Sequence, residues 1–109
     1  MTVPGDKEQL FDAPSASPCT VTIEPTVDGG SVWMIITPTE TMAVGTIELP
    51  PEGDAVDGQE VVVNTTAEIT DLTVSATDLN VTGAPTTLAA NGYFTMKFTA
   101  STDTWYRIA

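Results

Sequence analysis

The chain has no histidine, a single cysteine and only three basic residues among its 109 residues. Without histidine, catalytic triads and other sites built on a histidine base are excluded. The lone Cys19 cannot form an intramolecular disulfide, which suits synthesis in a reducing compartment. The fifteen acidic residues give a net charge of −12, so binding to nucleic-acid phosphates or to anionic membranes is disfavoured.

Long apolar stretches are also missing. No run approaches the roughly 20 residues that a membrane-spanning helix needs, and the first ten residues lack the basic and then apolar pattern of a signal peptide. We therefore expect no membrane partner, no secretion through a signal sequence, and synthesis in the cytoplasm.

Residues that favour strands dominate what is present. The chain holds twenty threonines and eleven valines, and its eight glycines and eight prolines are spread between short apolar runs. No window has helical periodicity, and 109 residues suffice for one small core. The sequence predicts an all-β domain.

Strand-like runs recur about every ten residues, with turn residues between them. This spacing predicts a single small antiparallel β-sandwich or barrel-like roll of about eight short strands. The runs are Thr20–Ile23, Ser31–Thr37, Ala43–Leu49, Glu60–Asn64, Leu72–Ala76, Leu79–Thr82, Tyr93–Ala100 and Thr104–Ile108.

Two hairpins are predicted. Asp28-Gly29-Gly30 supplies turn residues between the first two runs. At the other end, Tyr93–Ala100 turns through Ser101-Thr102-Asp103 into Thr104–Ile108. In the first of these two strands, alternation places Phe94, Met96 and Phe98 on one face and Tyr93, Thr95 and Lys97 on the other, as in a strand with one buried side.

Residues 1–18 differ from the β domain expected over residues 19–109. Pro4, Gly5, Pro14 and Pro18 cannot sustain a helix or a central strand, so we expect an extended arm. Leu10-Phe11 is its only sizeable apolar pair and predicts a docking anchor. The arm could dock on its own domain, on a neighbouring copy or on a larger partner.

The run Val32–Ile36 is apolar on both faces, which predicts burial on both sides by a partner sheet or a partner chain. The aromatic pair Trp105-Tyr106 near the end of the chain fits either a core or a subunit contact, while stacking on a sugar is the alternative for Trp33 and this pair. The predicted subunit interface consists of Trp33, Met34, Ile35, Trp105 and Tyr106.

No catalytic or metal-binding pattern is found. Asp54, Asp57, Asp71 and Asp78 are the candidates, by their proximity in sequence, for paired carboxylates that cleave glycosides. Acids in turns and on polar strand faces are, however, the expected solvated surface. No spaced calcium loop with a closing glutamate is present. We expect no enzyme, no cofactor and no bound metal.

Five segments in the second half of the chain resemble the small β modules of tailed-bacteriophage virion proteins, which occur in capsid decoration (cement) proteins and at the ends of tail fibres and spikes. They form a turn, buried strands, a hairpin and an aromatic closing strand. The segments are Gly45–Pro50, Asp57–Val63, Ile69–Val74, Gly83–Phe94 and Thr104–Arg107.

The resemblance implies a homotrimer, which would bury the Val32–Ile36 run and the Trp105-Tyr106 end between subunits. It implies a structural role on the virion, with the major capsid protein as partner if the protein decorates the head. A 109-residue chain with a leading arm fits a decoration protein, with Leu10 and Phe11 docking on the capsid. A tail fibre or spike part is the alternative, followed by a carbohydrate-binding adhesin module.

Overall fold

The computed structural model describes residues 8–14, 18–23 and 31–109. Within these ranges the chain forms nine strands and one 3-10 turn, and no helix there is long and apolar enough to cross a bilayer. The predicted all-β class is confirmed. The elements are β1 (Glu8–Asp12), β2 (Cys19–Thr22), β3 (Val32–Ile36), β4 (Met42–Glu48), β5 (Glu60–Thr65), β6 (Ile69–Ser75), β7 (Asn80–Thr82), β8 (Tyr93–Thr99), η1 (Ala100–Thr102) and β9 (Thr104–Arg107).

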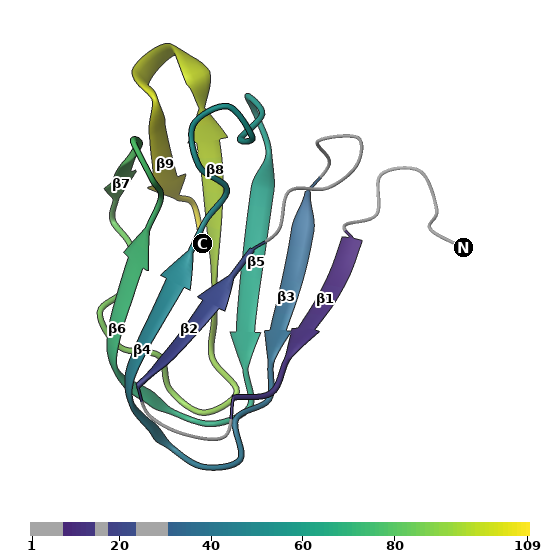
Figure 1. The fold of residues 1–109 in the computed structure, drawn as a ribbon, viewed down its shortest axis with the longest axis vertical. Helices are drawn as coiled ribbons and strands as arrows, with labels where there is room; N and C mark the ends of the chain where they lie inside the picture. Colours follow the sequence, from purple (N-terminus) through teal and green to yellow (C-terminus); the bar gives the residue numbers. More distant parts are fainter. Residues whose placement is uncertain (1–7, 15–17, 24–30) are drawn as a thin grey trace.

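The strands form two sheets, a larger one in the order β1-β3-β5-β8-β9-β7 and a smaller one in the order β2-β4-β6. From β1 to β6 the chain crosses to the other sheet after every strand, so neighbours within each sheet run parallel. Figure 1 shows the arrows of β1, β3 and β5 pointing one way and those of β2, β4 and β6 the other. This half of the molecule is therefore solenoid-like, a stack of coils in which each coil contributes one strand to each sheet.

The predicted antiparallel pairing is wrong among these six strands, whose pairs with one another are all parallel. β2 and β3, which were expected to form a hairpin, lie in different sheets, and the residues 28–30 proposed as its turn fall outside the described ranges. The edges of β3 are occupied instead by β1 and β5, each one coil away. From β1 to β6, the connections therefore move the chain between layers rather than folding it back within one.

The final hairpin is confirmed. β8 and β9 pair antiparallel, with Phe98 opposite Trp105, and β8 also pairs antiparallel with β5. The connection between them is η1, which ends at Asp103 in the left-handed region with φ of 51°. This hairpin extends the larger sheet beyond the last parallel coil.

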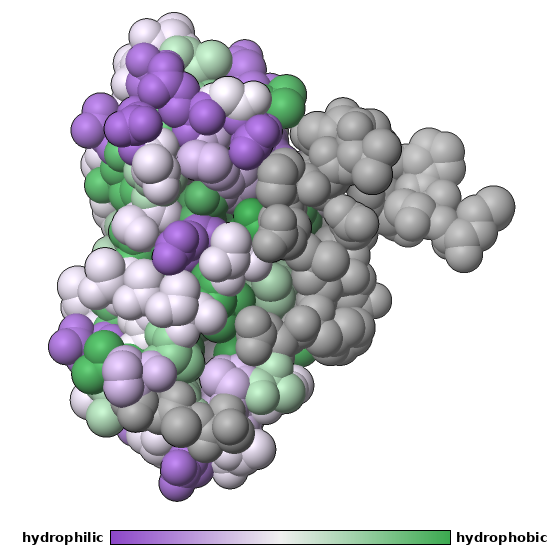
Figure 2. Space-filling view, viewed as in Figure 1, coloured by the Kyte–Doolittle hydropathy of each residue, from purple (hydrophilic) through white to green (hydrophobic). Residues whose placement is uncertain are grey.

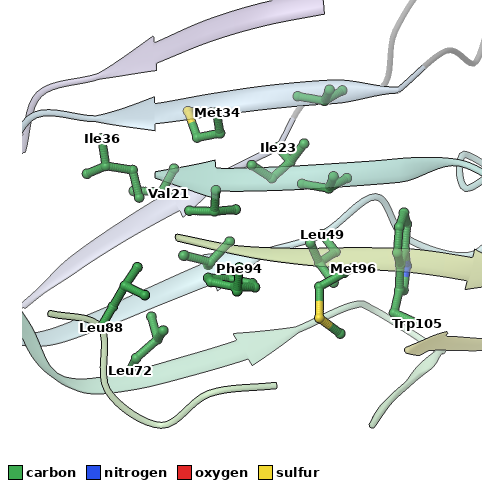
Figure 3. Close-up of a cluster of buried hydrophobic side chains, with 14 of the residues drawn as sticks. Val21, Ile23, Met34, Ile36, Leu49, Leu72, Leu88, Phe94, Met96 and Trp105 are labelled. Carbon is green, nitrogen blue, oxygen red and sulfur yellow. The ribbon is translucent and has the colours of Figure 1, made fainter. Parts of the chain in front are cut away.

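The core lies between the two sheets and receives side chains from both. Figure 3 shows side chains of both sheets in one cluster, with Val21 of β2 beside Met34 and Ile36 of β3, and Leu72 of β6 on the side of Leu88. Burying each large apolar side chain of this kind contributes about 1.5–3 kcal/mol, which makes this layer the main source of stability.

In β4 and β6, the alternation of buried and exposed residues is interrupted at corresponding positions. In β4, Met42 and Gly45 are buried while the two residues between them are exposed, and in β6 Ile69 and Leu72 repeat this spacing. Because Met42 lies opposite Ile69 and Gly45 opposite Leu72, the two breaks stack on each other. A Cβ atom at Gly45 would lie 3.0 Å from Ile69 Cγ2, so a larger residue at this position would require the Ile69 side chain to shift.

Part of the segment predicted as an arm is a strand of the domain. Residues 8–12 form β1, which pairs in parallel with β3 and is an edge of the larger sheet. The prolines that predicted an arm, at positions 4, 14 and 18, all lie outside these five residues, so each of the five keeps the backbone N–H that a strand needs. Residues 1–7 and 15–17 lie outside the described ranges.

Candidate interaction surface

The larger sheet has one face against the core and one face turned away from it. On the second face, Trp33 of β3 lies opposite Val62 of β5, and Val62 lies opposite Thr95 of β8. Beyond β9, Ile108 donates its backbone N–H to Thr95 O at 3.0 Å and continues this row. We call this surface the outer face. Its described members are Trp33, Ile35, Glu60, Val62, Asn64, Tyr93, Thr95, Lys97, Tyr106 and Ile108.

Large apolar side chains are exposed on the outer face. Tyr93 is 57% exposed, Ile108 54%, Trp33 38% and Tyr106 36%. Only two other large hydrophobic side chains are exposed among the described residues, and both lie elsewhere. Thr95 is only 7% exposed although it belongs to this face, so its larger neighbours cover it. The exposed side chains thus form a continuous layer rather than isolated points, which is typical of an interaction site.

Trp33 is held in place on this layer. Its Nε1–H donates to Asn64 Oδ1 at 2.6 Å. Asn64 is two residues beyond Val62, the register partner of Trp33, so the indole reaches diagonally from β3 towards β5. A ring fixed in this way loses little conformational entropy when a partner covers it.

The polar end of the outer face is nearly neutral. Glu60 lies opposite Lys97, and Lys97 lies opposite Tyr106. The Tyr106 hydroxyl is 3.1 Å from Thr102 Oγ1, which ties this ring to the turn between β8 and β9. One acid and one base side by side leave the face without net charge.

Three of the five residues predicted for a subunit interface lie on this face, and two do not. Trp33, Ile35 and Tyr106 point outward, whereas Met34 and Trp105 are buried in the core at 3% and 0% exposure. Successive residues of a strand point to opposite faces, so each buried residue follows or precedes an outward one. The prediction that Met34 and Trp105 contact another subunit is wrong.

Trp105 belongs to the core by its contacts as well. Its Nε1–H donates to Pro50 O at 3.3 Å, and its ring packs on Phe98 with centroids 5.3 Å apart and planes at 45°. The indole thus satisfies its one polar group inside the domain. A sugar-stacking role, the alternative considered for Trp105, is excluded by this burial.

The two residues of the predicted docking anchor are in β1. Leu10 lies opposite Met34 and Phe11 opposite Ile35. Their side chains are outside what the structure describes. β1 pairs with β3 on one side, and no other described strand pairs with it.

Sequence reasoning missed Tyr93, Val62, Asn64 and Ile108 as members of the surface. The alternation of β8 does place Tyr93 on the face opposite to Phe94, but nothing local indicates that this face meets Trp33. The pairing of β5 with both β3 and β8 joins them, and such pairing between distant segments has no local signal.

Acidic side chains gather at one end of the molecule, where the connection 50–59 meets the turn between β8 and β9. Asp57 Oδ1 accepts a hydrogen bond from Ala100 N at 2.9 Å, and Asp103 O accepts one from Asn80 N at 3.0 Å. Figure 2 shows hydrophilic side chains concentrated at this end. No group of three histidine, cysteine, aspartate or glutamate side chains within the described ranges is placed to hold a metal ion.

Comparison of the chain with protein-family models, with curated proteins and with solved structures gives no match in any of the three. The function is therefore argued from the surface and from the resemblance of the sequence segments.

Proposed function

We propose that this protein is a non-enzymatic structural component of a tailed-phage virion, a homotrimeric decoration protein that binds the outside of the capsid and stabilises the head. The observation that carries the proposal is the outer face, an exposed aromatic layer on a small, rigid β scaffold. Tyrosine and tryptophan are enriched where proteins contact one another, because they bury much area with few rotatable bonds.

The resemblance to virion modules supports the same role. Its segments supply much of β4, β5, β6 and β9 and lead into β8. Three of these strands, β5, β8 and β9, also carry most of the outer face. The part of the chain that resembles virion modules therefore overlaps with the part that exposes aromatic side chains.

Contact with the capsid is assigned in this proposal to the leading segment with Leu10 and Phe11. The backbone of β1 is at the edge of the larger sheet, and an edge strand can accept a strand of another protein. The major capsid protein is the proposed partner, and the virion surface the proposed location.

The proposal is tested by adding the purified protein to phage heads that lack it. We expect the protein to bind the outer surface, to appear there as three-fold density by electron cryo-microscopy, and to raise the temperature at which heads lose their DNA. The full-length chain carrying Leu10→Ser and Phe11→Ser, which removes the proposed docking pair, serves as the comparison. Heads with the same heat resistance with and without the protein would contradict the proposal.

A tail fibre or spike part is the second candidate, and the parallel coils of β1 to β6 favour it. Coils stacked in this way can be extended by further coils, as in elongated repeat proteins. Labelling the protein on intact particles separates the two roles, since a decoration protein lies on the head and a fibre part on the tail.

A further inference from the structure

The outer face combines exposed apolar area with a lack of net charge. The structure describes ten acidic side chains. Of these ten, Glu60 alone lies on the outer face. Lys97 lies directly opposite and balances it. The remaining described carboxylates lie elsewhere on the molecule.

This distribution of charge indicates which partner binds to the outer face. The chain carries a net charge of −12, so two copies repel each other over most of their surfaces. Repulsion is weakest where the outer face is turned towards the neighbour, and the apolar area available for burial is largest there as well. A basic protein would instead be attracted to the acidic end, away from the exposed aromatic side chains.

The two sides of the outer face, on either side of β5, differ in their residues. Trp33 and Ile35 lie on β3, whereas Tyr93, Tyr106 and Ile108 lie on or just beyond β8 and β9. The central strand β5 lies between them and is less exposed. Two different halves permit a head-to-tail ring of identical subunits, in which each copy presents one half to the preceding copy and the other to the next.

We propose that the outer face is the contact between copies of this chain, with the β3 half of one copy packed against the β8–β9 half of the next around a threefold axis. The threefold arrangement rests on the trimeric role proposed above, whereas the choice of the outer face rests on its exposure and charge. Trp33, fixed by Asn64, is the central anchor of the β3 half, and Tyr93 and Ile108 are the anchors of the other.

The test is sedimentation velocity and native mass spectrometry of the full chain and of three variants across the micromolar range. Tyr93→Ser and Ile108→Ser each remove an exposed side chain from the outer face, and Val56→Ser removes one of similar exposure, 44%, from a connection elsewhere. We expect the unchanged chain and V56S to be trimers, and each outer-face variant to need about a tenfold higher concentration to assemble, as when an interface hot spot is truncated.

Thermal unfolding of each variant controls for folding, because all three side chains are exposed and their loss leaves the core intact. A monomeric wild-type chain, or outer-face variants that assemble like V56S, overturns the interface. A dimer of the wild-type chain overturns the threefold arrangement. Specific binding of a glycan to a monomeric wild-type chain overturns the proposed interface and identifies the outer face as a sugar-binding surface.

Binding to phage heads, measured separately by cosedimentation, keeps this inference distinct from the proposed function. A trimer that assembles through the outer face but does not bind heads leaves the interface standing and removes the decoration role. If the chain binds heads while its outer-face variants assemble unchanged, the decoration role stands and the proposed interface is removed.

Discussion

The two tryptophans have opposite environments although both were predicted at one interface. Trp105 is fully buried with its indole N–H bonded to Pro50 O, whereas Trp33 is exposed and bonded to a neighbouring side chain. The difference lies in which face of its strand each occupies. Their substitutions should therefore affect different properties, stability for Trp105 and assembly for Trp33.

Trp105→Ala should lower the free energy of unfolding by about 3–5 kcal/mol, because it empties a large volume of the core and leaves Pro50 O without its partner. Trp105→Phe should cost less, since a ring remains to pack on Phe98. Urea unfolding followed by circular dichroism measures both. Tyr93→Ala is the matched control with an exposed ring, and equal losses for Y93A and W105A would contradict the placement of Trp105.

Gly45 is the second residue whose role is decided by packing. Gly45→Val should destabilise the domain by about 1–3 kcal/mol, because its Cβ alone would lie 3.0 Å from Ile69 Cγ2 and 3.5 Å from Cys19 Sγ. Ala43→Val, an exposed position on the same strand, should be nearly neutral. The difference between their urea midpoints checks the contact between Gly45 and Ile69, and a neutral G45V would show that the Ile69 side chain moves aside without cost.

At the scale of elements, the sequence predicted where strands lie better than how they pair. Each run of alternating or apolar residues, from Thr20–Ile23 to Thr104–Ile108, overlaps with a strand, because alternation is a local property. Pairing depends on which distant strand fills each edge, so glycine turns suggested hairpins where the chain actually changes sheets. The last hairpin was predicted correctly because both its strands and its turn are contiguous.

The same limit applies to the interaction surface. Trp33, Ile35 and Tyr106 were identified because they are apolar and stand in strands, but these criteria include Met34 and Trp105 equally. Periodicity separates the two faces of a strand without saying which of them meets the core when both are apolar, as in Val32–Ile36. That choice is made by the smaller sheet, which covers one side only.

The edge strand β1 leads to a prediction that differs from the arm hypothesis. An arm could be removed without consequence for the domain, but removing residues 1–12 exposes the edge of β3, whose five residues are all apolar. We expect the truncated protein to aggregate and to unfold at lower urea concentration, as exposed apolar edges promote association. Light scattering and urea titration test this. A soluble truncated chain of unchanged stability would restore the arm hypothesis.

For the molecule as a whole, repulsion between negatively charged copies opposes assembly, and salt should weaken this repulsion by screening it. Copies with a net charge of −12 repel one another, while the outer face contributes one opposed pair of charges and mostly apolar contacts. Raising the ionic strength from about 0.01 to about 0.15 M shortens the screening length from about 30 to about 8 Å, so the trimer should form at lower protein concentration. Sedimentation velocity in the two buffers measures the shift.

The opposite response would identify a different kind of contact. If salt dissociates the oligomer, ion pairs between copies hold it together, and the apolar outer face is not the interface. The V56S protein, which changes no charge, should respond to salt as the unchanged chain does.

The crossing of the chain between sheets sets the order in which this protein can fold. Glu8 must find Val32, 24 residues later, and Val32 must find Val61, 29 residues later, before either pair forms. Among the described strands, β8 and β9 alone pair with each other through a short turn, and they are made last. On the ribosome, the nascent chain therefore exposes β1 and β2 while it waits for β3 and β4. High contact order of this kind slows folding, and a net charge of −12 makes chains that have not yet folded repel one another.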